Sequence, residues 1–157
     1  MVEKATFAAG CFWGVQLEFD KVDGVISTVV GYIGGHKDAP TYEQVCEDNT
    51  GHAEAVEIEY DPNQVSYEQL LEIFWQRHDP TTLNSQGPDF GTQYRSGVFY
   101  HNEDQRSAAE ELKSKLDHAG AYSKPIVTEI VAASKFWPAE EYHQKYLEKK
   151  GITISCH

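Results

Sequence analysis

The chain has 157 residues, of which 40% are hydrophobic and 24% are charged, and this length and composition fit one globular domain. Its 13 basic and 25 acidic side chains give a net charge of −12, which argues against a nucleic-acid partner because phosphates bind basic surfaces. No apolar run reaches the about 20 residues that cross a bilayer. The N-terminal residues lack the pattern of a signal peptide, so we expect a cytoplasmic protein without membrane contact.

The first half of the chain alternates between strand and helix patterns. Residues 4–9 predict a short strand that runs into Gly10, and residues 12–19 predict a helix. Residues 27–32 are apolar and β-branched, and they end in a glycine turn. Residues 55–60 alternate between apolar and acidic side chains, which is typical of a half-buried strand.

The second half contains the clearest helix, over 66–78, where Ser66 and Gln69 form a capping-box pattern before apolar residues at helical spacing. A loop over 79–92 follows, and a loop of this length in a small domain is usually functional or mobile. The remaining pattern predicts a strand over 97–101, a helix over 102–118, a strand over 126–132 and a last helix over 138–150.

This order of elements predicts an α+β fold. We expect a two-layer sandwich with a mixed, mainly antiparallel sheet and helices, built as a ferredoxin-like core with additions. Helices on both faces of a parallel sheet are the alternative. The prediction places a single domain over 1–157 with a flexible C-terminal tail over 151–157, and it takes the protein to be a monomer.

Three cysteines, Cys11, Cys46 and Cys156, are too few for a secreted disulfide framework. Cys11 stands in the sequence Gly-Cys-Phe-Trp-Gly at the predicted strand-to-helix turn, where the helix dipole and free backbone N–H groups favour a thiolate. A thiolate is a nucleophile, and the two aromatic neighbours can form an apolar wall beside it. The same pattern also fits a small buried cysteine among core aromatics.

From this pentapeptide onward, the sequence resembles the A-type peptide methionine sulfoxide reductases. Six further blocks similar to that family follow in the family's order: 31–35 (GYIGG), 42–46 (YEQVC), 50–56 (TGHAEAV), 78–81 (HDPT), 86–96 (QGPDFGTQYRS) and 136–143 (FWPAEEYH). Two small departures are Ile33 and Pro88, where relatives commonly have a small residue and an asparagine. The resemblance covers nearly the whole chain, and it implies that the domain is catalytic.

Reduction of a sulfoxide requires a nucleophile at sulfur and a proton for the departing oxygen. By resemblance, Cys11 supplies the first and Glu54 the second, since a partly desolvated carboxyl favours its protonated form. The resemblance also assigns two tyrosines as hydrogen-bond donors to the oxygen, two aromatic residues to the methyl group, and two polar residues to the surroundings of the substrate: Tyr42 and Tyr94, Phe12 and Trp13, and Asp89 and His143.

Taken without the resemblance, several of these residues have simpler interpretations. Glu54 would be a solvent-facing carboxylate of its strand, and the two tyrosines would be interior packing. Asp89 would form a turn, and His143 would lie on a helix surface.

The implied reaction converts the S epimer of methionine sulfoxide, free or in proteins, to methionine and so repairs oxidised proteins. Cys11 becomes a sulfenic acid, a second thiol forms a disulfide with it, and thioredoxin or a similar dithiol reduces that disulfide. We favour Cys156 as the second thiol, with Cys46 as the alternative. Neither a metal nor an organic cofactor is expected.

Three other functions compete with this interpretation. A thiol hydrolase would use Cys11, His143 and a carboxylate. A metal site would use His52 and Glu54, although the Cys-x-x-Cys partner of zinc deaminases is absent from the sequence. A redox-switched binding module would form a regulatory disulfide between Cys11 and Cys156 without turnover.

Overall fold

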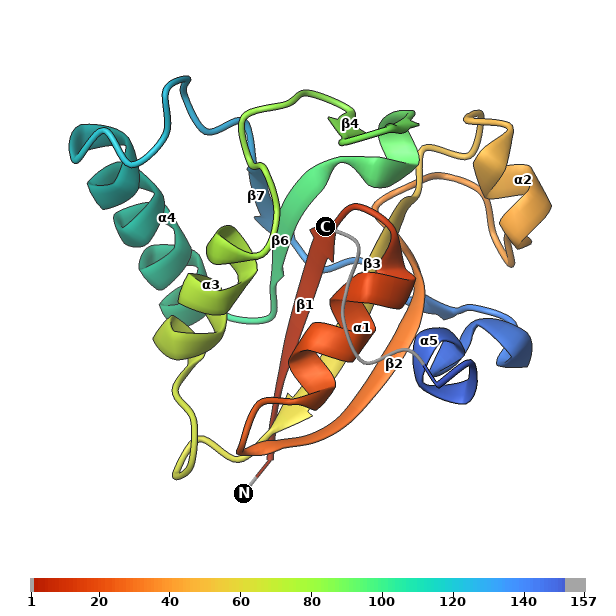
Figure 1. The fold of residues 1–157 in the computed structure, drawn as a ribbon, viewed down its shortest axis with the longest axis horizontal. Coiled ribbons are helices and arrows are strands. Elements are labelled where there is room, and N and C mark those ends of the chain that lie inside the picture. The colour runs from red at the N-terminus through yellow and green to blue at the C-terminus, as the bar shows by residue number, and fades with distance from the viewer. Residues whose placement is uncertain (1, 152–157) are drawn as a thin grey trace.

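A six-stranded sheet runs through the centre of the computed structural model, which describes residues 2–151 (Figure 1). The strand order is β7-β6-β1-β3-β2-β8. All neighbouring strands are antiparallel except β6 and β7, which are parallel. The strands span Glu3–Ala9 (β1), Val25–Ile33 (β2), Ala53–Tyr60 (β3), Ser96–Tyr100 (β6), Glu129–Ala132 (β7) and Trp137–Pro138 (β8).

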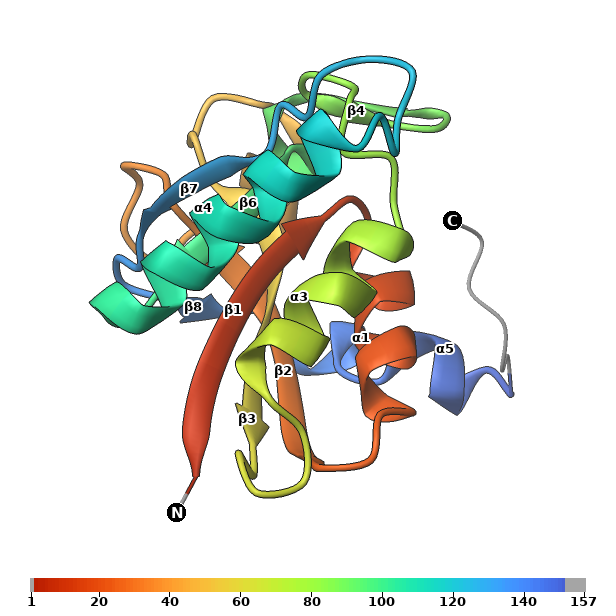
Figure 2. The ribbon, with the colours of Figure 1, turned by 90° about the vertical axis from the view of Figure 1, so that its left-hand side faces the viewer.

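The predicted ferredoxin-like core is confirmed. It follows the order β1, α1, β2, β3, α3, β6, and these strands lie in the sheet as β6-β1-β3-β2. The helices α1 (Phe12–Asp20) and α3 (Tyr67–Gln76) pack on the sheet, and α4 (Glu103–His118) lies against α3, β6 and β7 (Figure 2). The strands added to this sheet are therefore β7 at one edge and β8 at the other.

The main core fills the space between the sheet and these helices. Alternate residues of a strand point to the same face, so Glu54 shares its face of β3 with the core residues Val56, Ile58 and Tyr60. A smaller apolar cluster on the opposite face of the sheet packs against Phe136 and Ala133. Glu54 consequently lies on the helix side of the sheet, at the end of β3 that reaches the start of α1.

The turn between β1 and α1 determines the position of Cys11. Gly10 has φ +93°, a left-handed conformation that other residues rarely adopt. This turn makes Cys11 the N-cap residue of α1. The strand-to-helix turn predicted from the sequence is confirmed.

Both clearly predicted helix starts are also confirmed. The Ser66 hydroxyl accepts a hydrogen bond from Gln69 N, and the Gln69 side chain returns one from Ser66 N. The Asn102 side chain caps α4 by accepting from Gln105 N. These caps explain why α3 and α4 follow their sequence patterns closely.

The predicted last helix over 138–150 is wrong. In its place lie β8, a 3₁₀ turn at Glu141–His143 and a short helix, α5, at Tyr146–Lys149. The Gln144 side chain binds both the N–H and the carbonyl of Val30, as a neighbouring strand would, and Lys145 takes a left-handed conformation with φ 57°. Pairing with the edge of β2 thus overrides the helical spacing.

Three other segments differ from their predictions. A short helix, α2 (Tyr42–Cys46), was not predicted. The loop over 79–92 contains a two-stranded hairpin, β4 (Ser85–Gln86) with β5 (Asp89–Phe90), and a 3₁₀ turn begins at its end, at Thr92–Tyr94. β7 begins at Glu129 and not at 126, because Ile126 N and Val127 N donate to the Asp117 side chain and the Pro80 carbonyl.

Within residues 2–151, none of the helices is long and apolar enough to cross a bilayer.

Candidate active site

Cys11 is half-buried, with its thiol free, at the start of α1. Burial and the nearby Glu54 carboxyl raise the pKa of the Cys11 thiol to about 12, although the backbone N–H groups of Trp13 and Gly14 act to lower it. The sequence-based expectation of a stabilised thiolate is therefore wrong for the protein without substrate. The helix N-terminus acts in the expected direction, but desolvation outweighs it.

Glu54 is 1% exposed, so its interpretation as a surface carboxylate is wrong. Its Oε1 accepts a hydrogen bond from Phe12 N at 3.3 Å, while its Oε2 has no hydrogen-bond partner in the described part of the chain. Burial raises the pKa of the Glu54 carboxyl to about 8. At neutral pH this group is mostly protonated and can donate a proton.

Two tyrosines flank Glu54. Tyr42 is the first residue of α2 and Tyr94 ends the 3₁₀ turn, and both side chains are half-buried. Burial first and the Glu54 charge second raise both phenol pKa values far above neutral pH. Each hydroxyl therefore keeps its proton and can donate a hydrogen bond without carrying charge.

His143 is buried at 1% exposure, so its interpretation as a helix-surface residue is wrong. Its Nδ1 accepts a hydrogen bond from the Trp13 indole N–H at 2.9 Å, and its ring lies 5.2 Å from Phe12 and 4.3 Å from Tyr42, centroid to centroid. Because indole only donates, the imidazole is neutral and carries its proton on Nε2. Burial lowers the pKa of His143 and keeps it neutral.

A cavity of about 320 Å³ opens beside Cys11, in the size range of small-molecule sites. Trp13 forms one wall and is held by stacking on Tyr146 at 3.9 Å between ring centroids. Phe12 does not line the cavity, because its ring is buried against Tyr32 and Tyr42. The lining residues are Cys11, Trp13, Gly14, Gln86, Gly87, Pro88, Asp89 and Leu147.

The model of the peptide methionine sulfoxide reductase family matches residues 3–157. The chain belongs to this family. It is 61% identical to the peptide methionine sulfoxide reductase MsrA of Methanosarcina acetivorans over 96% of this chain and 80% of that relative. The family's members are oxidoreductases, and so is this protein.

Solved structures agree with this membership. The reduced form of Mxr1 from Saccharomyces cerevisiae has a TM-score of 0.91 and 37% identity, covering 99% of this chain and 89% of that one. Mxr1 in complex with Trx2 has a TM-score of 0.67 and 26% identity, covering 92% and 84%. The fold and the A-type resemblance inferred from the sequence are both confirmed.

Sequence reasoning missed one residue that organises the candidate site. Glu140 accepts hydrogen bonds from the Tyr32 hydroxyl at 2.8 Å and from Tyr42 N at 2.9 Å. Burial acts to raise the pKa of Glu140, but the hydrogen bonds from Tyr42 N, from its own backbone N–H and from the Tyr32 hydroxyl, together with the nearby His143, lower it overall. Its carboxylate thereby ties the start of α2, and with it Tyr42, to β2.

Of the two other cysteines, only Cys46 lies within the residues that the structure describes. Cys46 is exposed at the end of α2, where its thiol contacts the Tyr42 side chain, and burial raises its pKa. Cys156 lies outside the described residues. The assignment of the second thiol of this reductase therefore stays a prediction.

The arrangement of side chains does not favour a metal site or a hydrolase. Both ring nitrogens of His52 are bound to backbone, Nδ1 by Gly35 N at 3.1 Å and Nε2 by the Lys37 carbonyl at 2.6 Å. Residues 2–151 hold no group of three or more His, Cys, Asp or Glu side chains suited to a metal ion. For a hydrolase, His143 would have to activate Cys11, but it binds Trp13 instead.

Proposed function

We propose that this protein reduces the S epimer of methionine sulfoxide, free or in proteins, through a Cys11 sulfenic acid, and so repairs oxidised proteins. The observation that carries the proposal is the pairing of the Cys11 thiol with a buried Glu54 whose pKa is raised to about 8. A nucleophile and a proton donor for a neutral oxygen acceptor are the two groups that this reaction needs.

The reaction balances with these two residues. The Cys11 sulfur attacks the sulfoxide sulfur, a sulfur–sulfur bond forms, and the oxygen takes the proton of Glu54. The hydroxyl then passes to the Cys11 sulfur as the sulfur–sulfur bond breaks, and methionine leaves reduced by two electrons. The proton of the original thiol restores Glu54, and Cys11 is left as a sulfenic acid.

Because both groups are buried together, their ionisations oppose each other. Each negative charge raises the cost of the other, so the pair does not lose both protons at neutral pH. Once the sulfoxide oxygen, hydrogen-bonded by Tyr42 and Tyr94, has taken the Glu54 proton, the Glu54 carboxylate would accept the thiol proton as the Cys11 sulfur attacks, so the pair never carries two negative charges.

The remaining predicted residues would hold the substrate. Trp13 would form the apolar wall against the methyl group, and His143 would fix the Trp13 ring through its hydrogen bond to the indole. Asp89 lines the same cavity and would contact the main chain of the substrate. Phe12 would not touch the substrate but would support the Tyr42 ring by stacking against it.

Recycling would proceed through a disulfide. A second thiol displaces the hydroxyl of the sulfenic acid as water, and a dithiol then reduces the disulfide. We favour Cys156 as this thiol and thioredoxin as the reductant, and the yeast relative solved in complex with Trx2 supports the latter. Cys46, at the rim of the site, remains the alternative.

The proposal includes no metal and no organic cofactor, because every step uses only thiols and a carboxyl group. It takes residues 1–157 as one catalytic domain, active as a monomer in the cytoplasm. The proposed partners of the protein are oxidised proteins and a dithiol reductant. We propose that it binds neither nucleic acid nor a membrane.

A single-turnover experiment tests the proposal. Cys156→Ser protein, reduced and freed of reductant, is mixed with N-acetylmethionine sulfoxide amide, and dimedone is added to trap sulfenic acid. One equivalent of reduced product and a dimedone adduct on Cys11 are expected. Well-folded protein that forms neither product nor adduct would show that the proposed function is wrong.

A further inference from the structure

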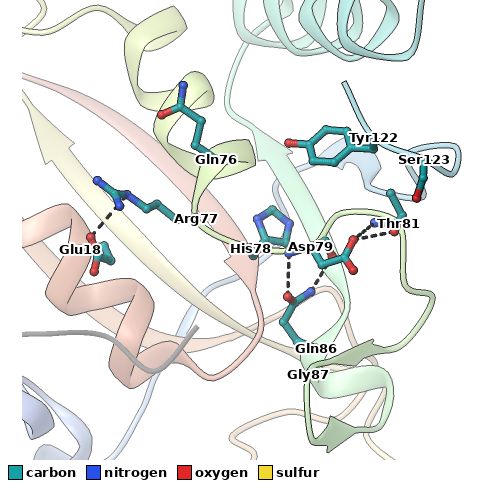
Figure 3. A pocket seen from close by; sticks show the side chains of 10 residues that line it. All are labelled: Glu18, Gln76, Arg77, His78, Asp79, Thr81, Gln86, Gly87, Tyr122 and Ser123. Carbon is teal, nitrogen blue, oxygen red and sulfur yellow. Dashed lines mark hydrogen bonds and ion pairs between the residues drawn. The ribbon is translucent and has the colours of Figure 1, made fainter. Parts of the chain in front are cut away.

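A second cavity, of about 730 Å³, lies next to the one at Cys11 (Figure 3). We call it the flanking groove. Figure 3 shows side chains that surround it from α1, from the end of α3, from the loop that follows, and from the segment after α4. The reaction proposed above uses none of the residues that line only this groove.

The flanking groove is continuous with the Cys11 cavity along two walls. Gln86 and Gly87 line both spaces. On α1, Cys11 and Gly14 line the first cavity, and Glu18, one helical turn beyond Gly14, lines the groove. A chain that leaves the Cys11 cavity along this helix face therefore enters the groove directly.

The wall that the groove shares with the Cys11 cavity is held in position by hydrogen bonds. Gln86 is buried, and its side-chain amide accepts from Asp79 N and donates to the Asp79 carbonyl, both at 2.7 Å. The Asp79 carboxylate in turn accepts from the Thr81 backbone and hydroxyl, and these bonds lower its pKa. A rigid wall of this kind binds a ligand with little loss of entropy.

The groove presents charges of both signs beside amides and hydroxyls. At its outer end, Arg77 Nε lies 3.5 Å from a Glu18 oxygen, but the Arg77 side chain is 59% exposed and that of Glu18 only 14%. The charge that a ligand meets there is consequently positive. Nearer the Cys11 cavity the accessible charge is the Asp79 carboxylate, so the groove does not have the uniformly basic character of a phosphate site.

We propose that the flanking groove binds the polypeptide on one side of the methionine sulfoxide and that Arg77 favours an acidic residue in that flank. A peptide backbone carries donors and acceptors in alternation, which matches the mixed polar walls. Because the groove shares Gln86 and Gly87 with the Cys11 cavity, the polypeptide on one side of a methionine sulfoxide seated there would reach it. This inference rests on the proposed function and specifies which substrates the site prefers.

A substitution that fills the groove with a large side chain tests whether a peptide substrate occupies it. Gln76→Trp places a large ring at the groove, and Glu72→Trp places the same ring one turn earlier on the same exposed face of α3, outside the groove. With dithiothreitol as reductant, kcat/KM is measured for a nine-residue peptide sulfoxide and for N-acetylmethionine sulfoxide amide. Gln76→Trp should lower only the peptide value, by about fivefold or more, equivalent to roughly 1 kcal/mol of binding. Glu72→Trp should change neither value.

Reversing the charge tests the role of Arg77. Paired peptides carry Glu or Lys at each of four positions on either side of the sulfoxide. At one position the wild type should favour Glu by about two- to fivefold in kcat/KM, the size of an exposed ion pair, and Arg77→Glu should favour Lys instead. Arg106→Glu on α4, which changes the net charge equally, should keep the wild-type preference.

The outcomes separate the two proposals. A wild type that does not reduce the short amide would overturn the proposed function. A wild type that does so, with variants that alter peptide and amide turnover equally, would overturn the groove assignment. Intact peptide turnover with dithiothreitol, combined with slowed recycling by thioredoxin in Gln76→Trp, would assign the groove to the reductant and overturn the peptide assignment.

Discussion

Replacing Glu54 by glutamine should stabilise the protein at alkaline pH and remove most of its activity. The native Glu54 carboxyl has a pKa of about 8, against 4.5 for an ordinary glutamate. Between these values the unfolded chain has already lost a proton that the native protein still holds. The free energy of unfolding contributed by Glu54 therefore falls as pH rises from 4.5 to 8.

The size of the effect follows from this interval. At about 1.36 kcal/mol per pH unit, the difference between 4.5 and about 8 corresponds to about 5 kcal/mol. Glutamine imitates the protonated acid, because its oxygen can keep the hydrogen bond from Phe12 N and its NH₂ replaces an oxygen that has no partner in the described residues. The variant should exceed the stability of the wild type by only about 1 kcal/mol at pH 5 and by up to about 5 kcal/mol at pH 8 and above.

Urea denaturation of both proteins at pH 5, 6, 7, 8 and 9 measures this difference. The matched control is Glu57→Gln on the same strand, which removes an equal charge from a carboxylate 3.6 Å from the exposed Lys4 ammonium. Burial is not relieved there, so the control should gain no stability at pH 8. A Glu54→Gln stability that stays parallel to the wild type from pH 5 to pH 9 would refute a native Glu54 held protonated by burial.

Three further predictions concern the proton donor, the second thiol and the hydrogen bond of Trp13. The rate of the first turnover should fall above about pH 8, as Glu54 loses the proton that the sulfoxide oxygen needs; rapid-quench measurements from pH 6 to 10 would show a flat profile if Glu54 were not the donor. Cys156→Ser should block recycling by thioredoxin while Cys46→Ser preserves it, and the reverse result would make Cys46 the second thiol. Trp13→Phe should lower the free energy of unfolding by about 1–3 kcal/mol in urea denaturation, because the buried His143 Nδ1 loses its donor; an unchanged stability would mean that this bond contributes nothing.

The sequence predicted the core of the fold because local signals there agree with tertiary packing. The Gly10 turn, the Ser66 cap and the alternating residues of β3 all specify the structure that is observed. A signal for α2 was also present, since Thr41 and Gln44 form the same capping box as Ser66 and Gln69. Only its short length made it easy to overlook.

The last helix could not be predicted in this way. Its residues have helical spacing, but the contacts that decide their structure are made with Val30, more than a hundred positions away in sequence. The same limit applies to Glu140, whose partners Tyr32 and Tyr42 lie 108 and 98 positions away. Local patterns contain no information about such pairs.

The candidate site was predicted from the order of the family's sequence blocks and not from single residues. The structure brings Cys11, Glu54, Tyr42 and Tyr94 together from four separate segments. The direction of the pKa shift of Cys11 could not be predicted from the sequence. The helix N-terminus that favours a thiolate is visible in the pattern, but the burial that outweighs it arises only from tertiary packing.

The most direct test of the account is product formation from the separated S and R epimers of a peptide methionine sulfoxide with dithiothreitol, for the wild type and Cys11→Ser. Turnover of the S epimer alone is expected, with its complete loss in the variant. Turnover of the R epimer, or S-epimer turnover that survives in Cys11→Ser, would contradict the assigned stereochemistry or the nucleophile, respectively. No turnover of either epimer by folded, reduced wild type would contradict the reductase function itself.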